Sequence, residues 1–527
     1  MAAMMIVDFQ NYFIFILLCL FSLLCYTLFF RKQKYSRLGF DLPPSPPSLP
    51  IIGHLHIILS LLIHKSLQKL ASKHGPLLHL RIFSLPIVLV SSASVADEIF
   101  KAQDVNVSSR SSLPTSEGSL YFGSFGFVTA PHGDYWKFMK KLITTKLLGS
   151  QALERSRGIR ADEAKLFYSN LLDKAMKDER VNIREEAMKL TNNSMCKMLT
   201  GRICLEDAER VRGLVARTDS LSKKLLLASV LRRPLEKLGI SLFKKELMCV
   251  SSRFDEVLER YLVEHEKKQE EQAEAMLHGV KIRHSEQGVD VMDVLIEAYR
   301  DENAEYKITR NHIKSLLVDL FIAGSETTSN IIEWTMAELI NNPKSLEKLR
   351  GEIDLIVGKT RLIQETDLPN LPYLQAVMKE GLRLHPPVPL VVRTFQEECE
   401  VKGFHIPEKT TLVVNGYAVM RDPDVWEDPD EFKPERFLVS STSGQQEDKI
   451  REKVPKYIPF GSGRRGCPGS NLAYLFLGIA VGVMVQCFDW RIKEEKVNMD
   501  EAAGAVSLRR AHPVHATPVA RNRDLLT

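Results

Sequence analysis

The sequence predicts a mainly α-helical protein with small β-sheets, preceded by one N-terminal transmembrane helix. Apolar residues recur at helical spacing over most of residues 95–357. β-like runs are short and confined to residues 77–90 and 411–415. Residues 9–30 contain no charge and consist mainly of Phe, Ile, Leu, Cys and Tyr.

The charge-free stretch at residues 9–30 indicates where the protein resides. As a helix it is about 33 Å long, enough to cross the roughly 30 Å hydrocarbon layer of a bilayer once. One acid, Asp8, precedes it, and four basic residues follow it closely: Arg31, Lys32, Lys34 and Arg37. Because positively charged flanks stay cytosolic, we expect a single-pass anchor in the endoplasmic reticulum membrane, surrounded by lipid, with the rest of the chain in the cytosol.

The chain divides into three expected parts. Residues 1–30 form the anchor, residues 31–50 a basic and proline-rich hinge, and residues 51–527 the folded body. A large core is expected, since 44% of the 527 residues are hydrophobic. The net charge of +5 is mild for this length and does not indicate a nucleic-acid partner. The eight cysteines show no pairing pattern, so no disulfide framework is expected.

Caps and prolines predict two helices in the second half of the chain. The first covers residues 311–340, with Thr309 as its N-cap and Pro343 just beyond its end. The second covers residues 372–385 and is stopped by Pro386 and the proline after it.

The first helix contains the run Ala-Gly-Ser-Glu-Thr-Thr at residues 323–328. Ala323 and Thr327 are four residues apart and share a face, and Gly324 lacks bulk where the helix would pass closest to a ligand. With Glu326, these residues are suited to a groove floor with proton donors. The alternative is a packing glycine beside a solvated glutamate.

The second helix carries a charged pair on a largely apolar surface. Glu380 and Arg383 are three residues apart, so their side chains meet on one face. Most such pairs lie at the surface and contribute little. The apolar neighbours favour burial here, where a lone charge is costly and a third partner is expected. Arg436 is the candidate for that partner.

Residues 460–469 place a single cysteine in a glycine-rich, doubly basic loop ahead of an apolar helix. The three glycines that precede the cysteine leave little bulk beside a flat cofactor and permit turns that aim several N–H groups at one sulfur. A helix that begins near Cys467 adds its positive end, so both effects favour a thiolate. Such a sulfur is suited to ligate haem iron in proteins that split the O–O bond.

The same loop has two other interpretations. Gly461, Gly463 and Gly466 have the spacing of a dinucleotide-binding fingerprint. That motif needs a βαβ unit, whereas Pro459 interrupts the preceding segment and only one β unit can follow. The other alternative is that Cys467 is a small buried hydrophobic residue, as most free cysteines are.

Four motifs in order make the chain resemble the cytochrome P-450 superfamily of haem-thiolate monooxygenases. They are Ala-Gly-x-Glu-Thr-Thr from residue 323, Glu-x-x-Arg from Glu380, Pro-Glu-Arg-Phe from Pro434, and Phe-x-x-Gly-x-Arg-x-Cys-x-Gly from Phe460. The resemblance covers essentially the whole chain and implies the cytochrome P-450 fold in one domain. The proline-rich hinge and the Arg-Leu-His-Pro-Pro run from Arg383 resemble the plant A-type microsomal branch. Within it, the chain is most similar to the crucifer group that includes triterpene oxidases of the thalianol and arabidiol pathways.

The resemblance implies haem b as cofactor and O2 as co-substrate, with electrons from NADPH through cytochrome P-450 reductase. Cys467 is implied as the axial ligand of the haem iron, Glu326 and Thr327 as the proton-delivering pair, and Glu380, Arg383 and Arg436 as structural. The residues implied to contact haem are Phe460, Arg465, Arg393, Trp136 and Lys140. Lys140 replaces the arginine usual in the family's Trp-x-x-x-Arg pair, which exchanges a bidentate fork for a point charge.

The implied substrate is a lipophilic plant metabolite, with a triterpene alcohol expected first and a flavonoid or other phenylpropanoid second. By resemblance, the substrate contacts residues 105–131, 205–250, 388–393, 505–508 and the first half of the long helix. Two other classes stay open: a haem isomerase or dehydratase that needs no external oxygen, and a haem sensor without catalysis. The Glu326 and Thr327 pair favours the monooxygenase, because such isomerases typically depart from it.

Overall fold

The computed structural model of the chain describes residues 41–110, 122, 126–201, 208–218, 220, 221, 224, 242–278, 290–438, 457–503 and 507–521. The expected anchor and the first half of the hinge lie outside the described residues, as do parts of the expected substrate stretches 105–131, 205–250 and 505–508. Over the described part, the prediction of a mainly helical protein with small sheets is confirmed.

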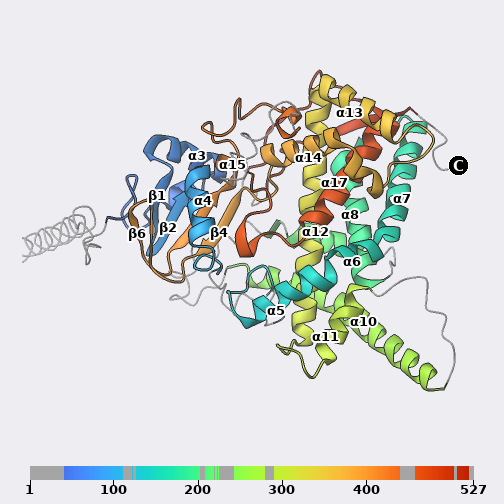
Figure 1. Cartoon of the computed structure of the whole chain (residues 1–527), viewed down its shortest axis with the longest axis horizontal. Coiled ribbons are helices and arrows are strands. Elements are labelled where there is room, and N and C mark those ends of the chain that lie inside the picture. Colours follow the sequence, from blue (N-terminus) through green and yellow to red (C-terminus); the bar gives the residue numbers. More distant parts are fainter. Residues whose placement is uncertain are drawn as a thin grey trace, which may run out of the picture.

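Helices form the larger part of the fold, and α12 (Arg310–Asn341) runs through the middle of that part (Figure 1). Its most extensive contacts are with α8 (Ile183–Thr200), α13 (Pro343–Ile356), α14 (Pro372–Leu384) and α17 (Ser470–Cys487). The predicted cap is confirmed, since the Thr309 hydroxyl accepts a hydrogen bond from the His312 backbone N–H. Because neighbours surround α12, it is buried on nearly every side.

The remaining helices are short apart from two. The two long ones are α7 (Arg157–Met176) and α10 (Lys244–Leu277), and α10 projects from the helical part in Figure 1. The others are α2 (Leu55–Ile58), α3 (Ile63–His74), α4 (Ala93–Ala102), α5 (Asp134–Leu142), α6 (Ser150–Arg155), α11 (Val291–Arg300), α15 (Gly416–Val419), the π-helix η2 (Ile143–Leu147) and the 3-10 helices η3 (Glu365–Asn370), η4 (Pro434–Phe437) and η5 (Gly463–Arg465).

The largest sheet lies on the opposite side of the molecule from α7 and α13 (Figure 1). It has four strands in the order β1 (Leu77–Ile82), β2 (Leu85–Val90), β7 (Thr411–Asn415) and β4 (Leu390–Thr394). β2 and β7 are parallel, and the other pairs are antiparallel. A second sheet has the order β3 (Val181–Asn182), β9 (His515–Ala520), β8 (Phe488–Arg491), and β5 (Cys399–Val401) pairs with β6 (Phe404–Ile406).

α17 is the one helix of the described residues that is long and apolar enough to span a membrane. It carries no charged side chain, and 72% of it is buried inside the protein. Its apolar surface is therefore covered by α12, α13, α14 and α7. We interpret α17 as the core helix that follows the cysteine loop.

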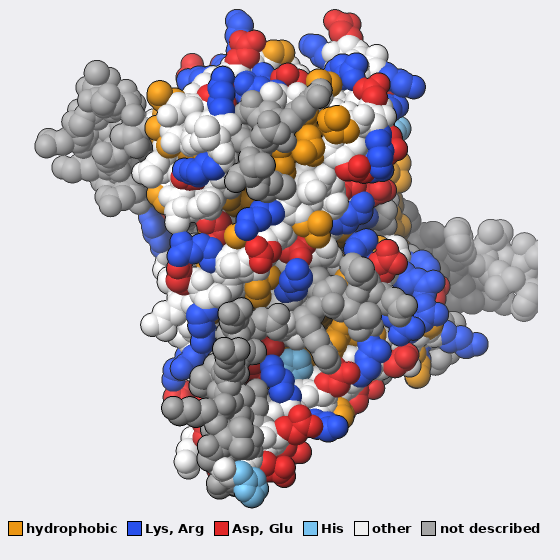
Figure 2. All heavy atoms as spheres, turned by 90° about the vertical axis from the view of Figure 1, so that its right-hand side faces the viewer, with side chains coloured by type: hydrophobic (Ala, Val, Ile, Leu, Met, Phe, Trp, Pro, Cys, Tyr) orange, Lys and Arg blue, Asp and Glu red, His pale blue; other side chains and the backbone are white. Residues whose placement is uncertain are grey.

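The face shown in Figure 2 carries basic and acidic side chains interspersed with each other, with hydrophobic side chains between them. Many of the charges of the described residues form surface pairs, such as Lys348 with Glu435 and Lys177 with Asp173. Such exposed pairs each contribute little to stability.

Candidate functional site

The cysteine loop is a tight turn between residue 457 and the start of α17. The Cys467 backbone N–H donates to the Phe460 carbonyl at 2.9 Å, and Gly466 N–H donates to the Gly463 carbonyl at 2.8 Å. Gly463 has a φ of +67°, and a Cβ there would lie 2.0 Å from Asp104 Oδ1. The same Asp104 oxygen accepts from the Arg464 backbone N–H at 2.9 Å. Asp104, which follows α4, thus holds the loop in place at a position that only glycine fits.

Cys467 is an exposed residue, although protein atoms surround most of its thiol. That combination is expected of a group that lines an internal hollow. Burial raises the pKa of the Cys467 thiol, and the Gly469 N–H and the Lys140 charge oppose this. Burial therefore outweighs both the backbone N–H and the neighbouring lysine, and a bound metal would have to displace the thiol proton.

One stretch of α12, a helix that packs against α17, is open. Ala323 is exposed and Thr327 partly exposed, in a helix that is otherwise mostly buried. The Thr327 hydroxyl donates to the Ala323 carbonyl at 2.5 Å, so the two residues share a face as expected. The expectation for Gly324 was wrong: a Cβ there would lie 2.8 Å from Met195 Cε on α8. Gly324 therefore permits close packing of α8 on α12, since residue 324 is turned about 100° from residue 323.

Buried positive charge gathers beside the cysteine loop. Arg393, on β4, is 2% exposed, and Arg465 is 8% exposed. Burial, followed by repulsion from Arg110, lowers the pKa of each of these two guanidinium groups to about 9. Arg393 Nε and Trp136 Nε1 are buried with no hydrogen-bond partner among the described residues. Surplus positive charge and unpaired donors are what an anionic ligand would satisfy, so these residues fit the two carboxylates of haem.

Trp136 and Lys140 lie on α5 next to this charge. The Arg465 guanidinium lies 4.3 Å from the centre of the Trp136 ring, and its Nε donates to the Ser108 carbonyl at 2.6 Å. Lys140 Nζ donates to the Gly466 carbonyl at 2.7 Å. Burial lowers the pKa of Lys140, while the Cys467 charge opposes this. The lysine thus contacts the backbone beside the sulfur.

Glu326 points away from the open face of α12. It is 2% exposed, and its Oε1 accepts from Arg184 at 2.5 Å and Asn330 at 3.2 Å and pairs with Arg509 at 2.7 Å. Its Oε2 is buried and has no hydrogen-bond partner among the described residues. Glu326 and Thr327 are therefore adjacent in sequence, but their side chains lie on different sides of α12.

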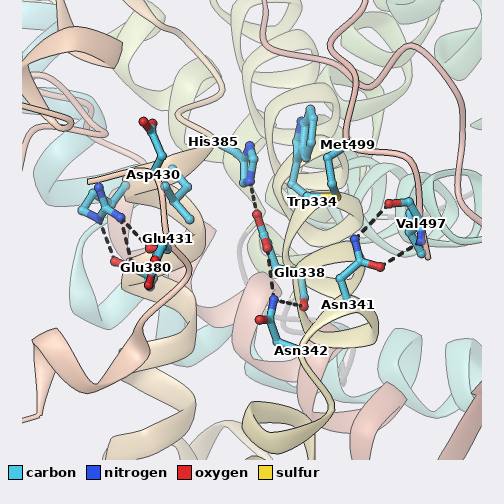
Figure 3. A network of polar contacts seen from close by, with 12 residues as sticks. Trp334, Glu338, Asn341, Asn342, Glu380, His385, Asp430, Glu431, Val497 and Met499 are labelled. Carbon is cyan, nitrogen blue, oxygen red and sulfur yellow. Dashed lines mark hydrogen bonds and ion pairs between the residues drawn. The ribbon is translucent and has the colours of Figure 1, made fainter. Parts of the chain in front are cut away.

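Glu380, Arg383 and Arg436 come together as expected. Arg383 donates to both Glu380 oxygens at 2.7 and 2.8 Å, and Arg436 Nε lies 3.2 Å from Glu380 Oε1. Arg383 also donates to three backbone carbonyls, those of Met420, Pro429 and Glu431. Figure 3 shows Glu380 and Glu431 side by side in this cluster. Both members of the pair are fully buried, so the cluster fixes α14 to the segment that contains η4.

A second group of metal-binding side chains lies apart from the cysteine loop. His265, Asp290 and Asp293 have ligand atoms within 4.8 Å of one another. Asp290 and Asp293 form the capping box of α11, and His265 Nε2 contacts Asp290 at 3.0 Å. Because hydrogen bonds join these side chains to one another, we interpret the group as one that connects α10 to α11.

Sequence reasoning missed Asp104, Arg509 and Trp334. Asp104 and Arg509 lie in segments without a motif, and their partners lie 360 and 183 positions away. Trp334 lies eleven residues after Ala323 on α12, where a buried tryptophan has no distinctive pattern. No local signal could have identified them.

Comparison with known proteins gives a consistent result. The family model described as Cytochrome P450 matches residues 43–514. The chain is 64% identical to Cytochrome P450 705A5 of Arabidopsis thaliana, over 99% of both chains. It is 39% identical to 3,9-dihydroxypterocarpan 6A-monooxygenase of Glycine max, over 96% of this chain and 98% of that protein. A solved zebra fish cytochrome P450 structure with progesterone superposes with a TM-score of 0.70 at 23% identity, covering 86% of this chain and 99% of that one, which shows a shared fold.

Proposed function

This chain belongs to the cytochrome P450 family, and from that premise we propose that it oxidises a triterpene alcohol at the endoplasmic reticulum membrane. It is a plant haem b monooxygenase that uses O2 and electrons from NADPH supplied by a reductase. The predicted cytochrome P-450 fold is confirmed. The substrate, the membrane and the roles of individual residues are the proposed part.

The observation that carries the residue roles is the exposed Cys467, in a loop that backbone hydrogen bonds and Asp104 hold in place. We assign Cys467 as the axial ligand of the haem iron. When bound, haem b supplies the oxidising chemistry, in which O2 is reduced and one oxygen atom is transferred to the substrate. Phe460 packs on Tyr474 of α17 with ring centres 5.3 Å apart and accepts the Cys467 N–H, so it supports the ligand from the loop.

The cations beside the loop would bind the haem carboxylates. Arg393 and Arg465 each have a pKa lowered by burial and by neighbouring positive charge, and two carboxylates would relieve both penalties. Trp136 would contribute its unpaired indole N–H. Lys140 would act through its contact with the Gly466 carbonyl, next to the ligand.

Proton handling falls to Thr327 and Glu326. The Thr327 hydroxyl lies on the open face of α12, with its proton on the Ala323 carbonyl until a better acceptor enters. Glu326 Oε2 is a buried acceptor that no described residue contacts by a hydrogen bond, and such atoms commonly bind ordered water. We propose that water at Oε2 restores the proton of the Thr327 hydroxyl, so Glu326 acts on Thr327 indirectly.

Sequence similarity favours a triterpene alcohol as substrate. Identity is 62–64% to two Arabidopsis thaliana relatives, Cytochrome P450 705A5 and 705A22, whose names state no substrate. The sequence resembles the crucifer group that includes triterpene oxidases. Val388 and Val392 are 48% and 47% exposed and offer apolar surface in an expected substrate segment. A flavonoid or related phenolic is the second candidate, because the 39% identical Glycine max relative is named for a pterocarpan.

Microsomes from yeast that co-express the full chain and a plant cytochrome P-450 reductase test the proposal. Thalianol, arabidiol and a flavanone are supplied separately with NADPH and isotopically heavy O2. We expect a product with one heavy oxygen atom from a triterpene alcohol. A product from the flavanone alone would favour the second candidate, and turnover without NADPH would indicate an isomerase.

Two cysteine variants separate the residue assignment from general effects. Cys467→Ser should lose the thiolate-type carbon-monoxide spectrum and all product, since serine does not supply the sulfur anion. Cys399→Ser is the matched control, because Cys399 is a partly buried cysteine on β5, far along the chain from the loop. Retention of the thiolate-type spectrum in Cys467→Ser would refute the assignment.

A further inference from the structure

Three consecutive residues near the C-terminus bind to the central helix α12. The Leu508 carbonyl accepts the indole N–H of Trp334 at 3.2 Å. The Arg509 guanidinium pairs with Glu326 at 2.7 Å. The Arg510 guanidinium lies 4.8 Å from the centre of the Trp334 ring. Residues 508–510 are therefore fastened to two turns of α12, between residues 326 and 334.

The Trp334 ring is fixed in place. It is 1% exposed and stacks on His385 with ring centres 4.0 Å apart and an angle of 5° between the planes. His385 Nε2 is in turn 2.7 Å from Glu338 Oε1, one turn further along α12. Figure 3 shows Trp334 and Glu338 on the same helix, with His385 approaching both. The direction of the indole N–H is thus set by groups other than Leu508.

Leu508 also joins a second segment. Its backbone N–H donates to the Pro387 carbonyl at 2.9 Å. The chain continues from Pro387 to Val388, whose side chain is 48% exposed, and then into β4, which carries Arg393. Leu508 therefore connects Trp334, through its carbonyl, to the segment that leads to Arg393, through its N–H.

This attachment reaches the side of α12 that carries Thr327. Trp334 lies seven residues after Thr327, which is two helical turns along the same side of the helix. One helical turn is about 5.4 Å. A shift of Leu508 relative to Trp334 would consequently alter the packing along the side of α12 on which Thr327 lies.

We propose that Trp334 is a positioning residue, whose indole N–H holds Leu508 at a fixed distance from α12 and thereby sets which carbon of the substrate is oxidised. The effect of Trp334 on which carbon is oxidised rests on the proposed function. The claim that Trp334 holds Leu508 in place does not, because it concerns the protein without substrate. Any buried aromatic residue could fill the core here, but only an indole N–H in this orientation satisfies the Leu508 carbonyl.

The test compares two tryptophan variants of the full chain. Trp334→Phe keeps a ring that can stack on His385 and removes the N–H. Trp490→Phe is the matched control, because Trp490 Nε1 also donates to a backbone carbonyl, that of Met484, at 3.0 Å. If Trp334→Phe does not fold, benzothienylalanine at position 334 replaces the N–H with sulfur in a ring of nearly the same size.

Hydrogen exchange measures the position of the segment without substrate. Loss of one hydrogen bond should speed amide exchange of residues 507–510 about fivefold in Trp334→Phe and leave it unchanged in Trp490→Phe. Unchanged exchange in Trp334→Phe would overturn the proposal.

Product analysis with thalianol in reductase-containing microsomes measures the consequence. The ratio of positional isomers should change about fivefold in Trp334→Phe, with the thiolate-type spectrum retained. Faster exchange with an unchanged ratio would reduce Trp334 to a structural residue and overturn the positioning role. If the wild-type chain oxidises no probe, the proposed substrate is wrong, and the exchange result alone decides whether Trp334 holds Leu508.

Discussion

Arg383→Lys tests the physical account of the buried charge cluster on α14. Arg383 is fully buried and makes five hydrogen bonds, two to Glu380 and three to backbone carbonyls. Lysine keeps the positive charge but has three donors around one nitrogen. At least two of the five contacts are therefore lost, and their acceptors stay buried.

The expected loss of stability follows from these contacts. Hydrogen bonds to charged groups contribute about 1.5–3 kcal/mol each, so two lost contacts cost about 3–6 kcal/mol. The unfolding entropy of a chain of 527 residues is roughly 1 kcal/mol/K, from about 2.1 cal/mol/K per residue. A loss of about 1 °C in the unfolding temperature per kcal/mol predicts a decrease of about 3–6 °C.

Thermal unfolding of the haem-loaded full chain, followed by circular dichroism and by loss of the thiolate-type spectrum at one scan rate, measures this decrease. Arg436→Lys is the control, since the Arg436 side chain is 12% exposed, and its contacts with Glu380 and the Asp428 carbonyl are ones that the donors of a lysine can also make. Its unfolding temperature should fall by about 1 °C or less. The reasoning is refuted if Arg383→Lys unfolds within 1 °C of the wild type, or if both variants lose the same amount.

Three further variants address the open face, the cysteine loop and a buried histidine. Thr327→Val should keep haem but lower the amount of product per NADPH consumed by about tenfold or more, since proton delivery is lost. An unchanged amount of product per NADPH would contradict the role of the hydroxyl. Gly463→Ala should lower haem content, because its Cβ would collide with Asp104, whereas Gly403→Ala shares the positive φ without a collision and should retain haem. Burial lowers the pKa of His385 below 6.5, so the unfolded chain binds more protons than the folded protein as the pH falls below that value. Stability is thus lost on acidification. Between about pH 7 and about pH 5, the unfolding temperature of His385→Gln should therefore fall by less than that of the wild type. An equal fall in both proteins would show that other groups cause the loss of stability.

Local signals were sufficient for the main elements of the fold. The long helix was expected at residues 311–340 and runs over Arg310–Asn341, because Thr309 supplies a side-chain cap. The second predicted helix, α14, begins at Pro372 as expected and ends at Leu384, ahead of the proline pair. β7 covers Thr411–Asn415 as predicted. Each of these boundaries depends on residues within one or two turns of it.

Contacts between distant segments were predictable only where a motif carried them. The pair of Glu380 and Arg383 follows from helical spacing, and Arg436 was chosen because its motif completes a known set. The prediction that Gly324 faces a ligand is wrong, since Gly324 faces Met195 of α8. α12 is buried on nearly every side, and its sequence does not indicate which face meets α8. The partners of Trp334 and Arg509 depend on the path of the C-terminal segment, which no local pattern encodes.

The two faces of α12 explain why adjacent residues affect different properties. Successive residues on a helix are turned by about 100°, so Thr327 lies on the open face while Glu326 faces α8 and Arg509. A change at Glu326 alters the ionic contact of the C-terminal segment and the proposed proton supply together, and its effect on turnover cannot be assigned to either one. Trp334→Phe disturbs the segment and leaves Thr327 intact, whereas Thr327→Val does the reverse. Comparing product ratio with product per NADPH in these two variants separates substrate position from proton delivery.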